Sequence, residues 1–387
     1  MNGCGGFTPR GGPGRSTRTA AIAFSIGSLA VLPATAASNF ELTVQLDKTD
    51  FRVGDEVIAH FALTNVGDEA VDHGDFAGEE NCDFSFDLSV TTADGAPLAN
   101  PLRNEGFSIS CLGTTIRLGP GDAARTSFPV NRRASLLTPG DYLVTGRYGE
   151  IQSPPVPLRL APRSPEEMGQ YIDGLIAQLK NAPSPKAPFQ RVGEINRYRV
   201  LERLMYTGDA RVLPIMVDAM YEGPTPARDA LLYFLPDRAE AVRALIDTAS
   251  RRGLALDMTV ILRMLGAPVR DTYPAIERSL SQDSPGTWQE GMRAASSSGD
   301  GDRFLPRVLA IARSPSSSAR LDALLYLTRF RSDEGVGVLR TALMDSDPQM
   351  RSFLVKGICS SIRRQSSASL GGRPLLASDF EPALCPP

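Results

Sequence analysis

One pattern of hydrophobic and polar positions recurs five times in the second half of the chain. Its first, fourth and eighth columns are mostly apolar, which is the spacing of one face of a helix. The steps between copies are 29, 31, 32 and 31 residues. A period of this length is typical of stacked helical units, because one helical pair cannot bury its apolar face alone. The copies read LPIMVDAM from Leu213, VRALIDTA from Val242, YPAIERSL from Tyr273, LPRVLAIA from Leu305 and VGVLRTAL from Val336.

A second helical segment is expected to alternate with these copies, after a first helix near 190–206. The segments are 227–233, 256–265, 287–295, 319–326 and 347–351. Polar residues upstream of the copies are predicted to be helix caps, namely Asp209, Asp237, Asp302 and Ser332. One helix of a pair opens with an arginine, and its partner contains a proline (Pro214, Pro274, Pro306). With these features, residues 190–360 resemble HEAT repeats. Armadillo-type arrays, which have similar helical pairs, are the alternative.

Residues 40–160 instead show short alternating segments separated by turn residues. Val57, Ala59, Phe61 and Leu63 alternate with their neighbours before a turn at 65–68. Segments of this kind predict an antiparallel β-sandwich. A Pro-Gly turn that delivers Tyr142 into a late strand resembles the tyrosine corner of immunoglobulin-like modules. The stretch 51–65 also resembles bacterial proteinase-inhibitor domains of the BsuPI type.

The N-terminal residues have the order of segments found in an export signal. Basic residues precede an apolar run from Ala20 to Leu32, and the triplet 34–36 offers a cleavage site. An uncleaved anchor is the alternative. Four cysteines follow this leader, an even number that in an oxidising compartment indicates disulfides. We expect Cys82 to pair with Cys111 and Cys359 with Cys385; unpaired thiols are the alternative.

These patterns together predict a multidomain β + α protein. It would comprise a signal peptide (1–36), an immunoglobulin-like β-sandwich (37–162), a bridging helix with a Pro-rich linker (163–189), a HEAT-like α-solenoid (190–363) and a C-terminal tail (364–387).

The composition and motifs point away from the common catalytic classes. The net charge of −3 offers no basic patch for nucleic acid, and the membrane is expected to be met only during export. A histidine-based hydrolase would have to use His60 or His73, the only histidines. The acidic stretch around His73 lacks the fixed ligand spacing of a calcium loop. No nucleophile elbow, zinc-protease motif or phosphate loop occurs. We therefore expect no catalytic, cofactor or metal site.

The predicted function is that of a non-catalytic exported scaffold for a protein or peptide partner. Helical-repeat arrays bind partners on a concave face, and polar columns of the repeated pattern would line it. These columns carry the candidate partner-binding residues Arg243, Asp247, Arg278, Arg307 and Arg340. A proteinase inhibitor acting through a sandwich loop and an unrecognised envelope hydrolase are the alternatives.

Overall fold

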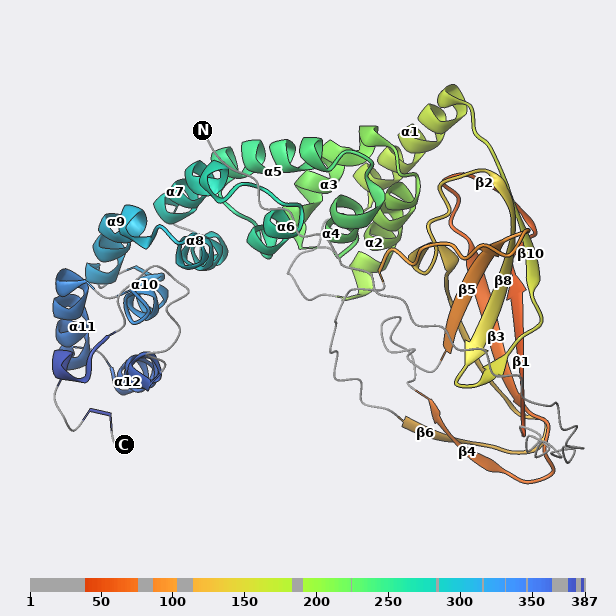
Figure 1. The fold of residues 1–387 in the computed structure, drawn as a ribbon, viewed down its shortest axis with the longest axis horizontal. Coiled ribbons are helices and arrows are strands. Elements are labelled where there is room, and N and C mark those ends of the chain that lie inside the picture. Colours follow the sequence, from red (N-terminus) through yellow and green to blue (C-terminus); the bar gives the residue numbers. More distant parts are fainter. Residues whose placement is uncertain are drawn as a thin grey trace, which may run out of the picture. The chain divides into compact units, whose positions relative to one another are not determined.

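The structure is a computed structural model. It describes residues 39–75, 86–102, 114–182, 191–223, 225–282, 285–314, 317–330, 332–345, 347–363, 375–380 and 384–385. The leader and the Cys82–Cys111 pair lie outside these residues. The described strands lie between 40 and 161 and the α-helices from 165 onward (Figure 1).

The described strands form two sheets and a separate two-stranded ribbon. One sheet has the order β1-β3-β7, the other β2-β10-β8-β5 with β9 beside β8, and the ribbon pairs β4 with β6. The pairings are antiparallel except for β2 with β10, which run parallel. The strands are β1 Phe40–Leu46, β2 Asp50–Arg52, β3 Ile58–Asn65, β4 Val71–Asp75, β5 Phe86–Thr92, β6 Thr114–Leu118, β7 Ala123–Pro129, β8 Gly140–Tyr148, β9 Ile151–Gln152 and β10 Val156–Ala161.

Apolar side chains from both main sheets form one core. Ala59, Phe61 and Leu63 of β3 are buried as their alternation predicts, and Phe61 stacks on Phe128 with ring centroids 4.6 Å apart. Gly146 of β8 lets the sheets approach, since a Cβ there would lie 2.4 Å from a methyl group of Val44. The Tyr142 hydroxyl donates a hydrogen bond of 2.7 Å to the Thr138 carbonyl, the contact expected of a tyrosine corner.

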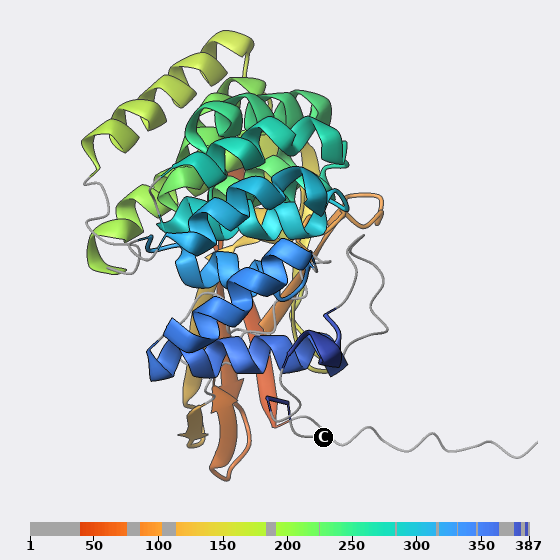
Figure 2. The same cartoon turned by 90° about the vertical axis from the view of Figure 1, so that its left-hand side faces the viewer.

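The helical region is built from two rows of helices. In one row α3, α5, α7, α9 and α11 pack in succession, and in the other the segment α4–η4 is followed by α6, α8, α10 and α12 (Figures 1 and 2). The helices are α1 Pro165–Asn181, α2 Arg191–Tyr206, α3 Leu213–Ala219, α4 Thr225–Asp229, the π-helical η4 Ala230–Phe234, α5 Arg238–Arg252, α6 Met258–Met264, α7 Tyr273–Ser281, α8 Pro285–Ser297, α9 Gly301–Arg313, α10 Arg320–Leu327, α11 Asp333–Asp345 and α12 Pro348–Arg363. All five copies of the repeated pattern fall in the first row.

The helix starts follow the predicted caps with one exception. Asp209, Asp237 and Ser332 each accept a hydrogen bond from a main-chain N–H in the following turn. The prediction that Asp302 is a helix cap was wrong, because α9 begins at Gly301 and Asp302 lies in its first turn. The first residue of α9 packs closely, since a Cβ at Gly301 would lie 1.9 Å from the Phe330 ring.

The prolines of the repeated pattern occupy two kinds of position. Pro214 and Pro274 lie in the first turn of α3 and α7, each after a 3-10 turn, and only Pro306 lies inside its helix. A first-turn proline costs no hydrogen bond, since the N–H there has no partner within the helix. The expectation of a proline inside the helix therefore holds for α9 alone among these three.

A buried ion pair connects the β region to α2. The Arg132 guanidinium, which follows β7, lies 2.9 Å from Glu202 and donates a 2.7 Å hydrogen bond to the Tyr198 hydroxyl. The Arg132 and Glu202 side chains are 12% and 4% exposed. Burial raises the pKa of the nearby Tyr206 hydroxyl well above its ordinary value, which keeps it neutral. Removing one partner would leave a buried charge uncompensated, so this contact fixes the junction.

The segment predicted as a bridge belongs to the helical core and also contacts the β region. Ser164 and Glu167 form a capping box at the start of α1. The apolar face of α1 packs on α2, while Arg52 pairs with Glu167 at 2.5 Å, and Arg163 with Asp55. The Pro-rich residues that follow α1 lie outside the described part of the chain.

Candidate functional site: a pocket between the last helices and the C-terminal tail

Two of the five candidate partner-binding residues lie on α5 and point into solvent. Arg243 and Asp247 are exposed, and neither makes a hydrogen bond or ion pair within the described residues. They are one helical turn apart, so they share a face of the helix. Arg243 and Asp247 thus lie on the solvated side of an amphipathic helix.

The other three candidates each donate a hydrogen bond to a main-chain carbonyl of a different element. Nε of Arg278 donates to the Arg251 carbonyl at 2.9 Å, and Nε of Arg307 to the Leu280 carbonyl at 2.9 Å. Both acceptors are in the last turn of the preceding helix in the row, where carbonyls lack a partner within their own helix. Arg278 and Arg307 therefore link neighbouring repeats, a role that their exposure does not reveal.

Arg340 makes the corresponding contact with the C-terminal tail. Its Nε donates to the Asp379 carbonyl at 2.7 Å. It also lines a cavity of about 760 Å³. The cavity is lined by Arg340, Leu343 and Met344 of α11, Arg351 of α12, and Phe380 and Leu384 of the tail. We call this cavity the tail pocket. Its volume is within the range of ligand sites in proteins.

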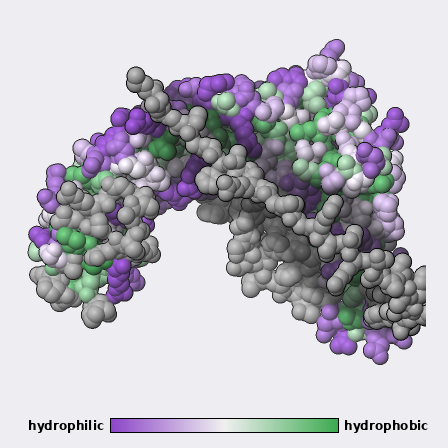
Figure 3. Space-filling model, viewed as in Figure 1, coloured by the Kyte–Doolittle hydropathy of each residue, from purple (hydrophilic) through white to green (hydrophobic). Residues whose placement is uncertain are grey.

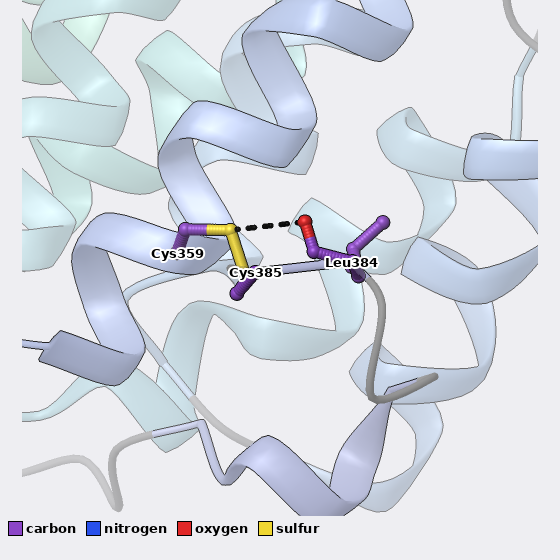
Figure 4. Close-up of a disulfide and its surroundings, with 3 residues drawn as sticks. All are labelled: Cys359, Leu384 and Cys385. Carbon is purple, nitrogen blue, oxygen red and sulfur yellow. Dashed lines mark hydrogen bonds between the residues drawn. A yellow bond between two sulfur atoms is a disulfide. The ribbon is translucent and has the colours of Figure 1, made fainter. Parts of the chain in front are cut away.

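The tail is held against the last helices by covalent and apolar contacts. The predicted disulfide between Cys359 of α12 and Cys385 is present, with Cα atoms 5.4 Å apart (Figure 4). Cys359 Sγ also lies 3.6 Å from the Leu384 carbonyl oxygen. Leu375 and Phe380 are buried in the same core as the helices. The disulfide thus keeps Leu384 at the pocket wall.

The tail pocket combines cationic groups with apolar walls. Arg351 donates through Nη2 to the Met344 carbonyl at 3.1 Å. Within the described residues, neither Arg340 nor Arg351 has a carboxylate at ion-pair distance, and the rest of their N–H groups have no hydrogen-bond partner. Met344 is 75% exposed. Hydrophobic surface is visible at this end of the helical region (Figure 3). Such a site can bind an anion that carries an apolar group.

A buried carboxylate in the middle of the helical region links two neighbouring helices. Glu290 of α8 is fully buried, accepts a 3.2 Å hydrogen bond from the Thr259 hydroxyl of α6 and lies 2.9 Å from Arg293. Burial raises the pKa of the Glu290 carboxyl, which Arg293 partly offsets. These contacts join α8 to the first turn of α6, whose N-cap Asp257 adopts a left-handed conformation.

A Ser-His-Asp arrangement lies on the outer face of the β1-β3-β7 sheet. His60 Nδ1 is 2.7 Å from Ser127 Oγ, and its Nε2 is 2.6 Å from Asp47 Oδ1. His60 and Ser127 face each other across β3 and β7. The alternation of the sequence placed His60 outward, but the two partners became visible only through strand pairing. The His60 and Asp47 side chains are 47% and 54% exposed, so water screens the arrangement.

Other catalytic or metal-binding groupings do not stand out in the described ranges. There, no group of three or more His, Cys, Asp or Glu side chains is placed to hold a metal ion. His73 lies in β4 opposite Ile116. No helix among the described residues is both long enough and apolar enough to cross a membrane.

Comparisons with known proteins give no family assignment. No protein family model and no curated protein matches the chain. Among solved structures, a β-glucosidase from Erythrobacter marinus is 11% identical with a TM-score of 0.21, over 32% of this chain and 15% of that one. A β-glucosidase from Listeria innocua in complex with glucose is 11% identical with a TM-score of 0.18, over 32% and 16%. A polysaccharide lyase is 10% identical with a TM-score of 0.15, over 85% and 47%. The chain thus spans less than half of each, and similarities this low carry no argument.

Proposed function

We propose that this chain is an exported, non-catalytic interaction protein that binds a protein or peptide partner in the tail pocket. In this proposal the β region is an immunoglobulin-like sandwich and the helical region a HEAT-like solenoid. The observation that carries it is the lining of the tail pocket, which combines apolar side chains with two arginines that have no carboxylate partner in the described structure. Two rows of helices, the first carrying a sequence pattern that recurs every 29 to 32 residues, support the HEAT-like assignment.

In this proposal the binding surface lies at one end of the array and not along its whole face. Arg278 and Arg307 bond to neighbouring helices through Nε, as Arg340 does to the tail, but they are not among the residues that line the tail pocket. Arg340 is the one residue of the predicted set that lines the tail pocket. Export is supported by the leader pattern and by the Cys359–Cys385 disulfide, since disulfides persist in oxidising compartments.

Selection from a peptide library tests the binding function. Random peptides displayed on particles are selected against the full chain without its leader, against Arg351→Gln, and against the control Arg243→Gln. We expect the wild type and the control to enrich the same peptides and Arg351→Gln to lose them. If the wild type enriches no peptide, or Arg351→Gln enriches the same set, the proposed function is wrong.

A weak hydrolase is a second candidate, and the Ser127-His60-Asp47 arrangement is the observation that favours it. With a proton on Nε2 held by Asp47, Nδ1 could accept the Ser127 proton as a general base. The wide exposure of the three residues argues for low activity. Labelling of Ser127 by a fluorophosphonate, abolished in His60→Ala, would support this function. An unlabelled Ser127 would exclude an activated nucleophile there.

A further inference from the structure

We infer that the tail pocket recognises the free C-terminal carboxylate of a peptide whose last side chain is apolar. This inference rests on the proposed function and narrows it to one class of ligand. The first reason is the spacing of the lining residues on α11. Arg340, Leu343 and Met344 occupy positions i, i+3 and i+4, so the guanidinium and the apolar side chains lie one turn apart on the same face.

The second reason is that both arginines have N–H groups that make no hydrogen bond within the described residues. Each guanidinium carries five N–H groups in a planar fork. Arg340 and Arg351 each use one of them for a main-chain carbonyl, and the others have no hydrogen-bond partner in the described part of the chain. The existing bonds hold each guanidinium in place, and the free N–H groups match the two oxygens of a carboxylate.

The third reason is that a C-terminal residue joins both features at one carbon. Its carboxylate and its side chain are attached to the same Cα, so the carboxylate can bind the arginines while the side chain contacts Leu343, Met344 and Phe380. A fatty acid carries the same head group, but its long chain needs an enclosed apolar channel. Met344 at the wall is 75% exposed, which suits a short apolar side chain better.

Matched peptides test the inference directly. The probes are decapeptides of one sequence that end in leucine with a free carboxylate, in leucine carboxamide, or in lysine with a free carboxylate, and affinity for the full chain is measured by calorimetry. We expect amidation to weaken binding about 10- to 100-fold, the value of a hydrogen bond to a charged group. Replacing leucine by lysine should weaken it about tenfold.

Variants of the protein separate recognition from folding. Arg351→Gln should lose most of the preference for the carboxylate over the carboxamide, because only Arg340 remains to bind it, whereas Arg243→Gln should behave as wild type. Met344→Ser, a change at an exposed position, should lose the preference for leucine while keeping the preference for the free carboxylate. Circular dichroism of each variant confirms that the helices are intact.

Three outcomes would overturn the carboxylate inference, and one of them would also overturn the proposed function. Equal binding of the carboxylate and carboxamide peptides, still lost in Arg351→Gln, would overturn the carboxylate inference and leave the proposed function intact. Dodecanoate binding more tightly than every peptide would assign the tail pocket to a lipid and overturn the inference. Absence of binding by all peptides, together with failure of the library selection, would overturn both.

Discussion

Removal of the disulfide between α12 and the tail should loosen the last helices without unfolding the rest. The bridge closes a loop of 26 residues. The chain-entropy relation gives about 3.5 kcal/mol for a loop of that length. Leu375 and Phe380 are buried beside it, and each contributes about 1.5–3 kcal/mol by burial. Burial of these two side chains stabilises the docked tail about as much as the disulfide does. Without the disulfide, the tail should therefore stay docked for part of the time.

Hydrogen exchange measured by mass spectrometry is the suitable assay, because it resolves the stability of separate segments. In the double variant Cys359→Ser, Cys385→Ser, exchange in α11 and α12 should accelerate by up to about 300-fold, which corresponds to the loss of about 3.5 kcal/mol. Exchange in α2 should not change, since in the proposed solenoid repeats contact only their neighbours. Unchanged exchange in α11 and α12 would refute the reasoning, and equal acceleration in α2 would show that the array unfolds as one unit.

Three further predictions concern stability. Gly301→Ala should lower the free energy of unfolding by about 1–3 kcal/mol, because its Cβ would meet the Phe330 ring. Gly337→Ala is the control: it has open space around it and should leave the stability unchanged or raise it. Urea unfolding of both variants measures the difference. Tyr142→Phe should cost about 1 kcal/mol by the loss of its hydroxyl bond, and an unchanged urea midpoint would contradict that role. Glu290 has a pKa raised by burial above 4.5, so the folded state holds its proton to higher pH than the unfolded chain does. The stability of the wild type relative to Glu290→Gln should therefore fall as pH rises from about 4.5 through the folded pKa; a constant or rising difference would show that the ion pair outweighs burial.

Local patterns explain why the elements were predictable from the sequence. The repeated eight-column pattern fixed the positions of α3, α5, α7, α9 and α11, because amphipathic periodicity depends only on residues close in sequence. The alternation through Phe61 likewise located β3 and its buried face. The pairing of Cys359 with Cys385 was expected because it attaches the tail to the last repeat, and it is present.

The roles of exposed residues depend on distant contacts and were not predictable. Arg307 and Leu280 are 27 residues apart, and the acceptor is a main-chain carbonyl, which leaves no signal in the sequence. Arg351 was overlooked for a related reason: it reaches the tail pocket only because the tail folds back over α11 and α12. The parallel pairing of β2 with β10 joins segments more than 100 residues apart through three residue pairs, too few for a pattern. Ser127 and His60 were likewise brought together by strand register alone.

Hydrogen exchange with and without a bound peptide tests the central claim most directly. The full chain is measured alone and with a saturating decapeptide that ends in leucine and a free carboxylate. We predict slower exchange in α11, α12 and residues 375–385, with no change in α5. Protection centred on α5, where Arg243 and Asp247 lie, would instead place the partner on the face of the repeats, and it would contradict the assignment of binding to the tail pocket.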